Sequence, residues 1–169
     1  MSRLPSVLKM MSVFVNGESY AGQALKLTPP KLVFKTEEFV GGFGTVKMPT
    51  VLEALDIEHT YAGPIPRAIT AGFGSAGLGR EMIRWVGAYQ DQDSGRPQAH
   101  ELVAVGSHLE LEFGDQEVGT KVESKAMTHC TYFKWTVDGG VRFEIDKLER
   151  IFVVDGVDRY AELRAMIGL

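Results

Sequence analysis

The sequence predicts a mainly β protein: a β-barrel-like sandwich with one or two flanking α-helices. Apolar and polar residues alternate in several separate stretches, which is the period of a half-buried strand. Short turn sequences rich in Asp, Asn and Gly separate these stretches. Helical periodicity is confined to two short segments. The alternation alone leaves a closed barrel and a sandwich as alternatives.

Each alternating stretch should form a strand that buries one face, because successive side chains point to opposite sides. The expected apolar positions are Val13 and Val15; Leu55 and Ile57; Ile83, Trp85 and Tyr89; Val103, Val105, Leu109, Leu111 and Phe113; and Val141, Phe143 and Ile145. His108, Glu110 and Glu112 oppose the fourth set. A further strand-like run, Met127 to Val137, contains the one cysteine, Cys130, which we expect to be a small buried thiol.

Two segments have helical character. The first is short and covers Pro66 to Gly72. The second closes the chain, with Asp158 as its N-cap and Gly168 as the residue that ends it. Three apolar residues should form the packed face of this second helix: Tyr160, Leu163 and Ile167.

The stretch from about residue 37 to residue 49 shows no clear period and is expected to be a long irregular loop. Loops of this length are uncommon in small domains and are usually disordered or functional. A disordered loop should be poor in apolar residues. This one contains Phe39, Phe43, Val46 and Met48, with Gly41 and Gly42 between them. A loop folded back on its own domain is one interpretation; we favour an inter-subunit element that orders against a neighbour.

Length and composition restrict the classes of function. The 169 residues suffice for one domain with a core, and we expect residues 1–169 to form it. The net charge of -4 argues against a protein that grips nucleic acid through a basic patch. A single cysteine cannot form an internal disulfide. No stretch has the ~20 apolar residues of a membrane span, and the first ten residues lack signal-peptide features, so we expect synthesis in the cytoplasm.

One glycine-rich run matches a dinucleotide-binding fingerprint by letter. Gly72 to Gly77 reads Gly-x-Gly-x-x-Gly, and Asp91 and Asp93 follow near the distance of a ribose-binding acid. That mechanism requires a buried strand before the glycines and a helix that opens at the last one. Here a helical segment precedes the glycines and a strand follows them. We therefore interpret the run as a flexible connection.

No catalytic, metal-binding or cofactor-binding residue is predicted. Ser75 is not a nucleophile-elbow serine, because Phe73 stands where the first glycine of that motif belongs. The histidines lack metal-ligand spacing; they are His59, His100, His108 and His129. Glu110 and Glu112 share a strand face, as paired glycosidase carboxylates would. A solvated sheet face is the simpler interpretation of that pair.

Both ends of the chain carry motifs that occur together in one family. The N-terminal motifs are Phe14 to Gly22, Leu27 to Leu32 and Lys35 to Gly42. The C-terminal motifs are Thr131 to Lys134, Asp138-Gly139, Phe143 to Asp146, Asp155 to Arg159 and Ile167 to Leu169. In order and spacing they resemble the major tail tube protein of contractile-tailed phages, and also the R-type pyocin tube protein. Departures from the family pattern lie at Phe43, in Thr60 to Gln98 and in Lys147 to Arg150.

The resemblance implies a structural virion protein of the tail tube fold, not an enzyme. Hexameric rings would stack into the inner tube of a contractile tail and conduct DNA during ejection. The implied partners are the sheath, tape measure, baseplate and tail terminator proteins, with synthesis in the cytoplasm of the bacterial host. DNA would pass without sequence-specific binding, and Glu110 and Glu112 are the first candidates to line the channel. The alternatives are a pyocin or other contractile injection tube, a ligand-binding β-barrel and a nucleotide-dependent oxidoreductase.

Overall fold

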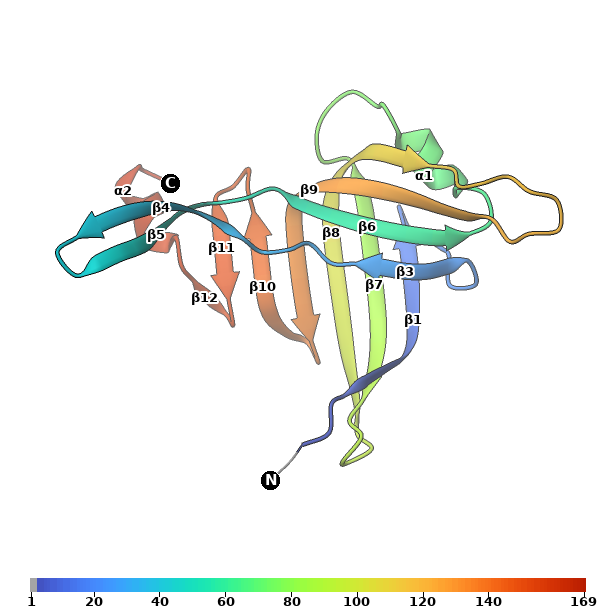
Figure 1. Cartoon of the computed structure of the whole chain (residues 1–169), viewed down its shortest axis with the longest axis horizontal. Helices are drawn as coiled ribbons and strands as arrows, with labels where there is room; N and C mark the ends of the chain where they lie inside the picture. The colour runs from blue at the N-terminus through green and yellow to red at the C-terminus, as the bar shows by residue number, and fades with distance from the viewer. Residues whose placement is uncertain (1–2) are drawn as a thin grey trace.

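The structure is a computed structural model that describes residues 3–169. Most of the described chain is strand, and the two helices are short (Figure 1). The strands are β1 (Val7–Val15), β2 (Glu18–Ser19), β3 (Ala24–Thr28), β4 (Phe34–Gly41), β5 (Gly44–Leu52), β6 (Leu55–Ala62), β7 (Glu81–Gln90), β8 (Pro97–Glu112), β9 (Glu123–Val137), β10 (Gly140–Asp146), β11 (Ile151–Val154) and β12 (Val157–Asp158). The helices are α1 (Arg67–Gly72) and α2 (Ala161–Met166).

Ten strands form one antiparallel sheet that folds over on itself. Its main path runs β12-β11-β10-β9-β8-β7-β1-β2, and β6 joins β9 to β3. Strand β9 divides between two partners: its first half, up to Cys130, pairs with β6, and the second half, from Tyr132, pairs with β10. Figure 1 shows β3, β6 and the first half of β9 running across the direction of β1 and β7.

The folded-over sheet confirms the predicted sandwich with flanking helices. In the described residues β12 and β2, the two ends of the path, do not pair with each other, so the closed barrel that the alternation left open is not formed. The core lies between the two layers. It is built from alternate residues of both, as the sequence predicts at Val13 and Val15 of β1, Leu55 and Ile57 of β6, and Ile83 and Trp85 of β7.

The predicted apolar face of β8 is wrong except at Leu111, which is partly buried and packs against the core. Leu102, Ala104 and His108 are buried, whereas Leu109 and Phe113 are 61% and 60% exposed. Two physical reasons explain the error. Apart from Leu102, the inward positions of this strand carry small or polar residues, so the outward valines look like the core face. The pairing with β9 also slips between His108 and Glu110, and such a bulge resets the alternation.

The two helices form where the sequence places them, with differences at the C-terminal one. Helix α1 buries Ile69, and Gly168 lies at positive φ after α2, as a helix-ending glycine does. The expected packed face of α2 is wrong, because α2 has no buried residue and Leu163 is exposed. Asp158 makes no cap bond to α2; its carboxylate instead accepts from the Tyr160 backbone N–H and pairs with the Arg164 guanidinium.

The stretch expected to be an irregular loop is a β-hairpin. Strands β4 and β5 pair in a separate two-stranded sheet, and Gly42 and Phe43 form the turn. Apolar and charged residues occur on both faces of this hairpin, and neither face is buried in the subunit. A strand without a buried face has no reason to show clean alternation, which is why the sequence pattern failed here.

Candidate subunit-contact surface

The β4–β5 hairpin gathers apolar side chains on one of its faces. Phe39 pairs with Val46 in the ladder, and two residues further from the tip Glu37 pairs with Met48. Directly paired residues lie on the same face of an antiparallel ladder, as do residues two apart on one strand. Phe39, Val46 and Met48 therefore form one apolar strip, which we call the hairpin strip. All three side chains are exposed.

Among residues 3–169, the contacts between the hairpin and the rest of the subunit lie at the hairpin base. The Phe34 ring packs edge-on against Phe152 of β11, with the centroids 5.8 Å apart. The Glu53 backbone N–H donates to the Val33 carbonyl at 2.8 Å, which closes the two strands at the base. Beyond this point the hairpin projects away from the folded sheet (Figure 1). An isolated two-stranded hairpin is marginally stable in water, so an exposed one is expected to gain order from a partner.

The tip of the hairpin depends on its glycines. A side chain at Gly41 would meet the Phe39 ring 3.1 Å away, so the glycine lets that ring lie close against the backbone. Gly44 adopts a φ of +117°, which favours glycine. The Phe43 side chain at the turn is completely exposed. The structure thus brings together the six residues predicted for inter-subunit contact, on a hairpin rather than a loop.

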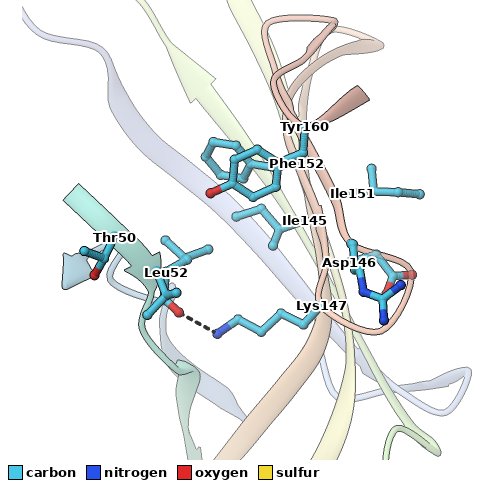
Figure 2. Close-up of a pocket in the computed structure, with 10 residues that line it drawn as sticks. Thr50, Leu52, Ile145, Asp146, Lys147, Ile151, Phe152 and Tyr160 are labelled. Carbon is cyan, nitrogen blue, oxygen red and sulfur yellow. Dashed lines mark hydrogen bonds between the residues drawn. The ribbon is translucent and has the colours of Figure 1, made fainter. Parts of the chain in front are cut away.

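An apolar groove lies beside the base of the hairpin, between β5, β10 and β11 (Figure 2). Its cavity measures about 260 Å³. The apolar lining comes from both sides and consists of Val51, Leu52, Ile145, Ile151, Phe152 and Tyr160. Lys147 and Arg150 also line it, and the Lys147 ammonium donates to the Leu52 carbonyl at 3.3 Å. The sequence analysis missed this groove, because its residues are far apart in the chain.

Glu110 and Glu112 share an outward face near the end of β8, as predicted. Glu110 pairs with Met127 of β9, and Glu112 pairs with Lys125. Both carboxylates are exposed, and Glu58 of β6 lies beside them around a shallow depression. The bulge at Leu109 shifts the pairing of β8 with β9 before Glu110. Glu110 and Glu112 both follow the bulge, so they remain on one face.

A chain of buried polar side chains crosses the core beneath this face. The Thr128 hydroxyl lies 2.8 Å from His59 Nε2 and 2.8 Å from His108 Nδ1. His108 Nε2 faces the Glu81 carboxylate at 3.7 Å. Burial, followed by the nearby His108, lowers the pKa of His59 to about 3. Burial also lowers the pKa of His108, against the opposing effect of Glu81, so both imidazoles are neutral at pH 7.

The glycine-rich run and Cys130 lie where the sequence predicts a connection and a buried thiol. Helix α1 ends at Gly72 and strand β7 begins at Glu81, so the glycine-rich run connects a helix to a strand. Burial raises the pKa of the Cys130 thiol to about 12, which keeps it protonated and unreactive. Across residues 3–169, no three metal-ligating side chains cluster as an ion site would require. None of the helices in that span is long and apolar enough to cross a bilayer.

The comparison with protein families decides the assignment. The model of the phage tail tube protein FII family matches residues 5–168. The chain belongs to this family. The tail tube protein of Escherichia phage P2 is 38% identical over 170 residues, which cover 98% of this chain and 99% of that protein. The major tail tube protein of Serratia phage KSP20 is 27% identical over 163 residues, covering 94% and 93%.

A solved structure shows the same fold at low sequence identity. The sheath/tube terminator of the extracellular contractile injection system PVC, in its extended state, aligns with a TM-score of 0.59 and 11% identity. The alignment covers 80% of this chain and 99% of that one. The family match and the P2 relative, and not this distant structure, make the chain a phage tail tube protein. It is a structural component of the tail and not an enzyme.

Proposed function

We propose that this tail tube protein forms six-subunit rings that stack into the hollow inner tube of a contractile tail and conduct DNA during ejection. The observation that carries the proposal is the projecting hairpin, whose apolar strip residues 3–169 leave exposed. The chain belongs to the tail tube family. A head-to-tail contact around a closed ring leaves both ring faces available for stacking. Obligate interfaces of this kind bury more than ~2,000 Å².

The hairpin is the element that we assign to contact between subunits. Phe39, Val46 and Met48 present one apolar strip, and Phe43 extends it at the tip. Burying an apolar side chain of this size stabilises an interface by roughly 1.5–3 kcal/mol. Several such side chains, repeated in each subunit, favour the assembled state strongly over the free monomer. Gly41 leaves room for the Phe39 ring, and Gly42 lies in the turn.

The acidic face at the end of β8 is the surface that we assign to the lumen. Glu110 and Glu112 point outward together beside Glu58. A negative wall repels the phosphates of passing DNA within a Debye length, ~8 Å at physiological salt. A wall rich in Lys and Arg would bind the phosphates instead and retain the DNA. The overall charge of -4 agrees with a conduit that does not hold its cargo.

The partners follow from the same assignment. The PVC chain that shares this fold is a sheath/tube terminator, which supports a sheath around this tube and a terminator at its end. We also assign a tape measure protein within the tube and a baseplate at its tip. The subunit is synthesised in the cytoplasm of the bacterial host before assembly.

Negative-stain microscopy of the purified protein tests the proposal. The expected result is hollow tubes of uniform diameter built from stacked rings. Protein that stays monomeric at high concentration and forms no tube would contradict it. The same image of particles from induced cells would show whether a contractile sheath surrounds such a tube.

A further inference from the structure

We propose that the apolar groove between β5, β10 and β11 receives the hairpin strip of a second copy of this chain. The proposal rests on the proposed function, since it names the surface against which the hairpin docks. In this contact the Phe39 ring enters the groove and Glu37, two residues away on the same hairpin face, reaches Arg150 at its rim.

The groove and the strip match in character. The groove is open and lined by aliphatic and aromatic side chains, among them Ile145, Phe152 and Tyr160 (Figure 2). The strip offers one aromatic and two aliphatic side chains that are exposed in the subunit. An aromatic side chain that fills an apolar pocket is the usual anchor of a protein interface.

The charges at the two surfaces are complementary. Arg150 and Lys147 line the groove. Asp146 also lines the groove, and its Oδ1 accepts from the backbone N–H groups of Leu148 and Glu149. On the hairpin, Glu38 lies on the opposite face and pairs with Lys47.

Glu37 is the acid on the strip face. Within residues 3–169, neither Glu37 nor Arg150 has an ion-pair partner. An unpaired acid beside the apolar strip thus faces an unpaired base beside the apolar groove.

The occupant has to be another copy. Val51 is part of both the groove and the base of the hairpin, and Val46 of the strip lies five residues along the same strand. At about 3.3 Å per residue, Val46 and the Phe39 paired with it lie roughly 17 Å from Val51, and a paired hairpin cannot fold back over that length to place the Phe39 ring in its own groove. Each subunit therefore carries one strip and one groove at different places, which produces a head-to-tail chain of contacts.

Charge reversal tests the contact without removing an anchor. Glu37→Arg and Arg150→Glu should each raise the protein concentration needed for tube formation about fivefold, the size of an ~1 kcal/mol ion-pair effect. The double variant should return to within twofold of the parent. Glu38→Arg combined with Arg150→Glu is the matched control and should not recover, because Glu38 lies on the other hairpin face. Additive defects in the Glu37 and Arg150 double variant would overturn the proposal.

Cross-linking tests the geometry independently. The double variant Glu37→Cys, Arg150→Cys is made in a Cys130→Ala background, and its tubes are treated with a short bismaleimide. This reagent is needed because two residues that form an ion pair have Cα atoms further apart than the ~7 Å that a disulfide tolerates. The expected product is a ladder of multimers, because head-to-tail contacts propagate. Glu37→Cys with Val118→Cys, on the exposed β8–β9 loop, should give no ladder.

The two failures are distinguishable. Tubes that form but yield no Glu37–Arg150 ladder, or a ladder through Val118 instead, overturn the groove assignment and leave the proposed function intact. A product that stops at the dimer shows a symmetric contact and also overturns it. A parent protein that forms no tubes contradicts the proposed function itself.

Discussion

Phe39 lies directly opposite Val46 in the β4–β5 ladder, and the two side chains are 59% and 58% exposed. A paired apolar couple of this kind is normally the inner face of a sheet. Here it belongs to a two-stranded sheet that nothing in the described subunit covers. The hairpin therefore has the composition of an interface element, and we propose that its partner lies outside the subunit.

Replacing Phe43 with alanine should impair assembly without unfolding the subunit. The Phe43 side chain is exposed, so the free energy of unfolding should change by less than about 0.5 kcal/mol. Loss of a buried anchor in the tube should raise the assembly concentration at least tenfold. Light scattering during assembly and urea unfolding of the free subunit measure the two effects. Val118→Ala, at another exposed position, is the control; a Phe43→Ala subunit that unfolds but builds normal tubes would refute the assignment.

Reversing the charge of Glu110 and Glu112 should spare the tube and hinder DNA. Both carboxylates point outward and make no ion pair within residues 3–169, so Glu110→Lys with Glu112→Lys leaves the fold in place. Lysines facing the lumen would attract phosphate, and ejection should slow or stop. The ejection rate from assembled particles measures this. The glutamine pair should have a smaller effect, and normal infection by the lysine variant would place the face outside the lumen.

The free subunit should lose stability as the pH falls below about 6.5. Burial lowers the folded-state pKa of His59 to about 3 and also lowers that of His108. A histidine held neutral in the fold contributes fully above its unfolded pKa of ~6.5, and the contribution falls as pH drops toward the folded pKa. Each such histidine costs up to ~1.4 kcal/mol per pH unit in that range.

Urea unfolding of the subunit at pH 7, 6, 5 and 4 measures this slope. Replacing His59 with glutamine should lower the stability at pH 7 and flatten the dependence on pH. Equal slopes in the wild-type and His59→Gln proteins would show that His59 does not cause the pH dependence.

Gly106→Ala should destabilise the subunit by about 3 kcal/mol. A Cβ at this position of β8 would lie 2.0 Å from the His129 carbonyl oxygen, and a backbone atom cannot move aside as a side-chain end can. Gly22→Ala is the matched control, because a Cβ there has nothing within 4 Å. Denaturant unfolding compares the two. A Gly106→Ala subunit as stable as the control would mean that β8 and β9 do not approach as closely as described.

The sequence predicted those features of the fold that follow from burial. Val13, Leu55 and Ile83 alternate with polar neighbours because one face of each strand is in the core. The prediction of the buried face failed where the buried positions do not hold the most apolar residues of the strand. On β8 the buried positions other than Leu102 hold alanine, glycine and histidine, which indicate a core face less clearly than the outward valines do.

The candidate contact residues were also predicted from an expectation about burial. Phe39 and Phe43 were predicted as contact residues because a segment that stays free in water should be poor in large apolar side chains. The sequence did not indicate that this segment pairs as two strands. The groove could not be predicted from the sequence, since Leu52, Ile145 and Tyr160 come together only through the tertiary fold. The link between Thr128 and the two histidines likewise required three strands to be placed side by side.

A cryo-electron microscopy reconstruction of tubes grown from the purified wild-type protein tests the central claim most directly. We predict six subunits in each ring, a hollow lumen, and the β4–β5 hairpin of every subunit packed on a neighbouring subunit. Protein that remains monomeric at high concentration, or tubes in which the hairpin contacts only its own subunit, would contradict the account.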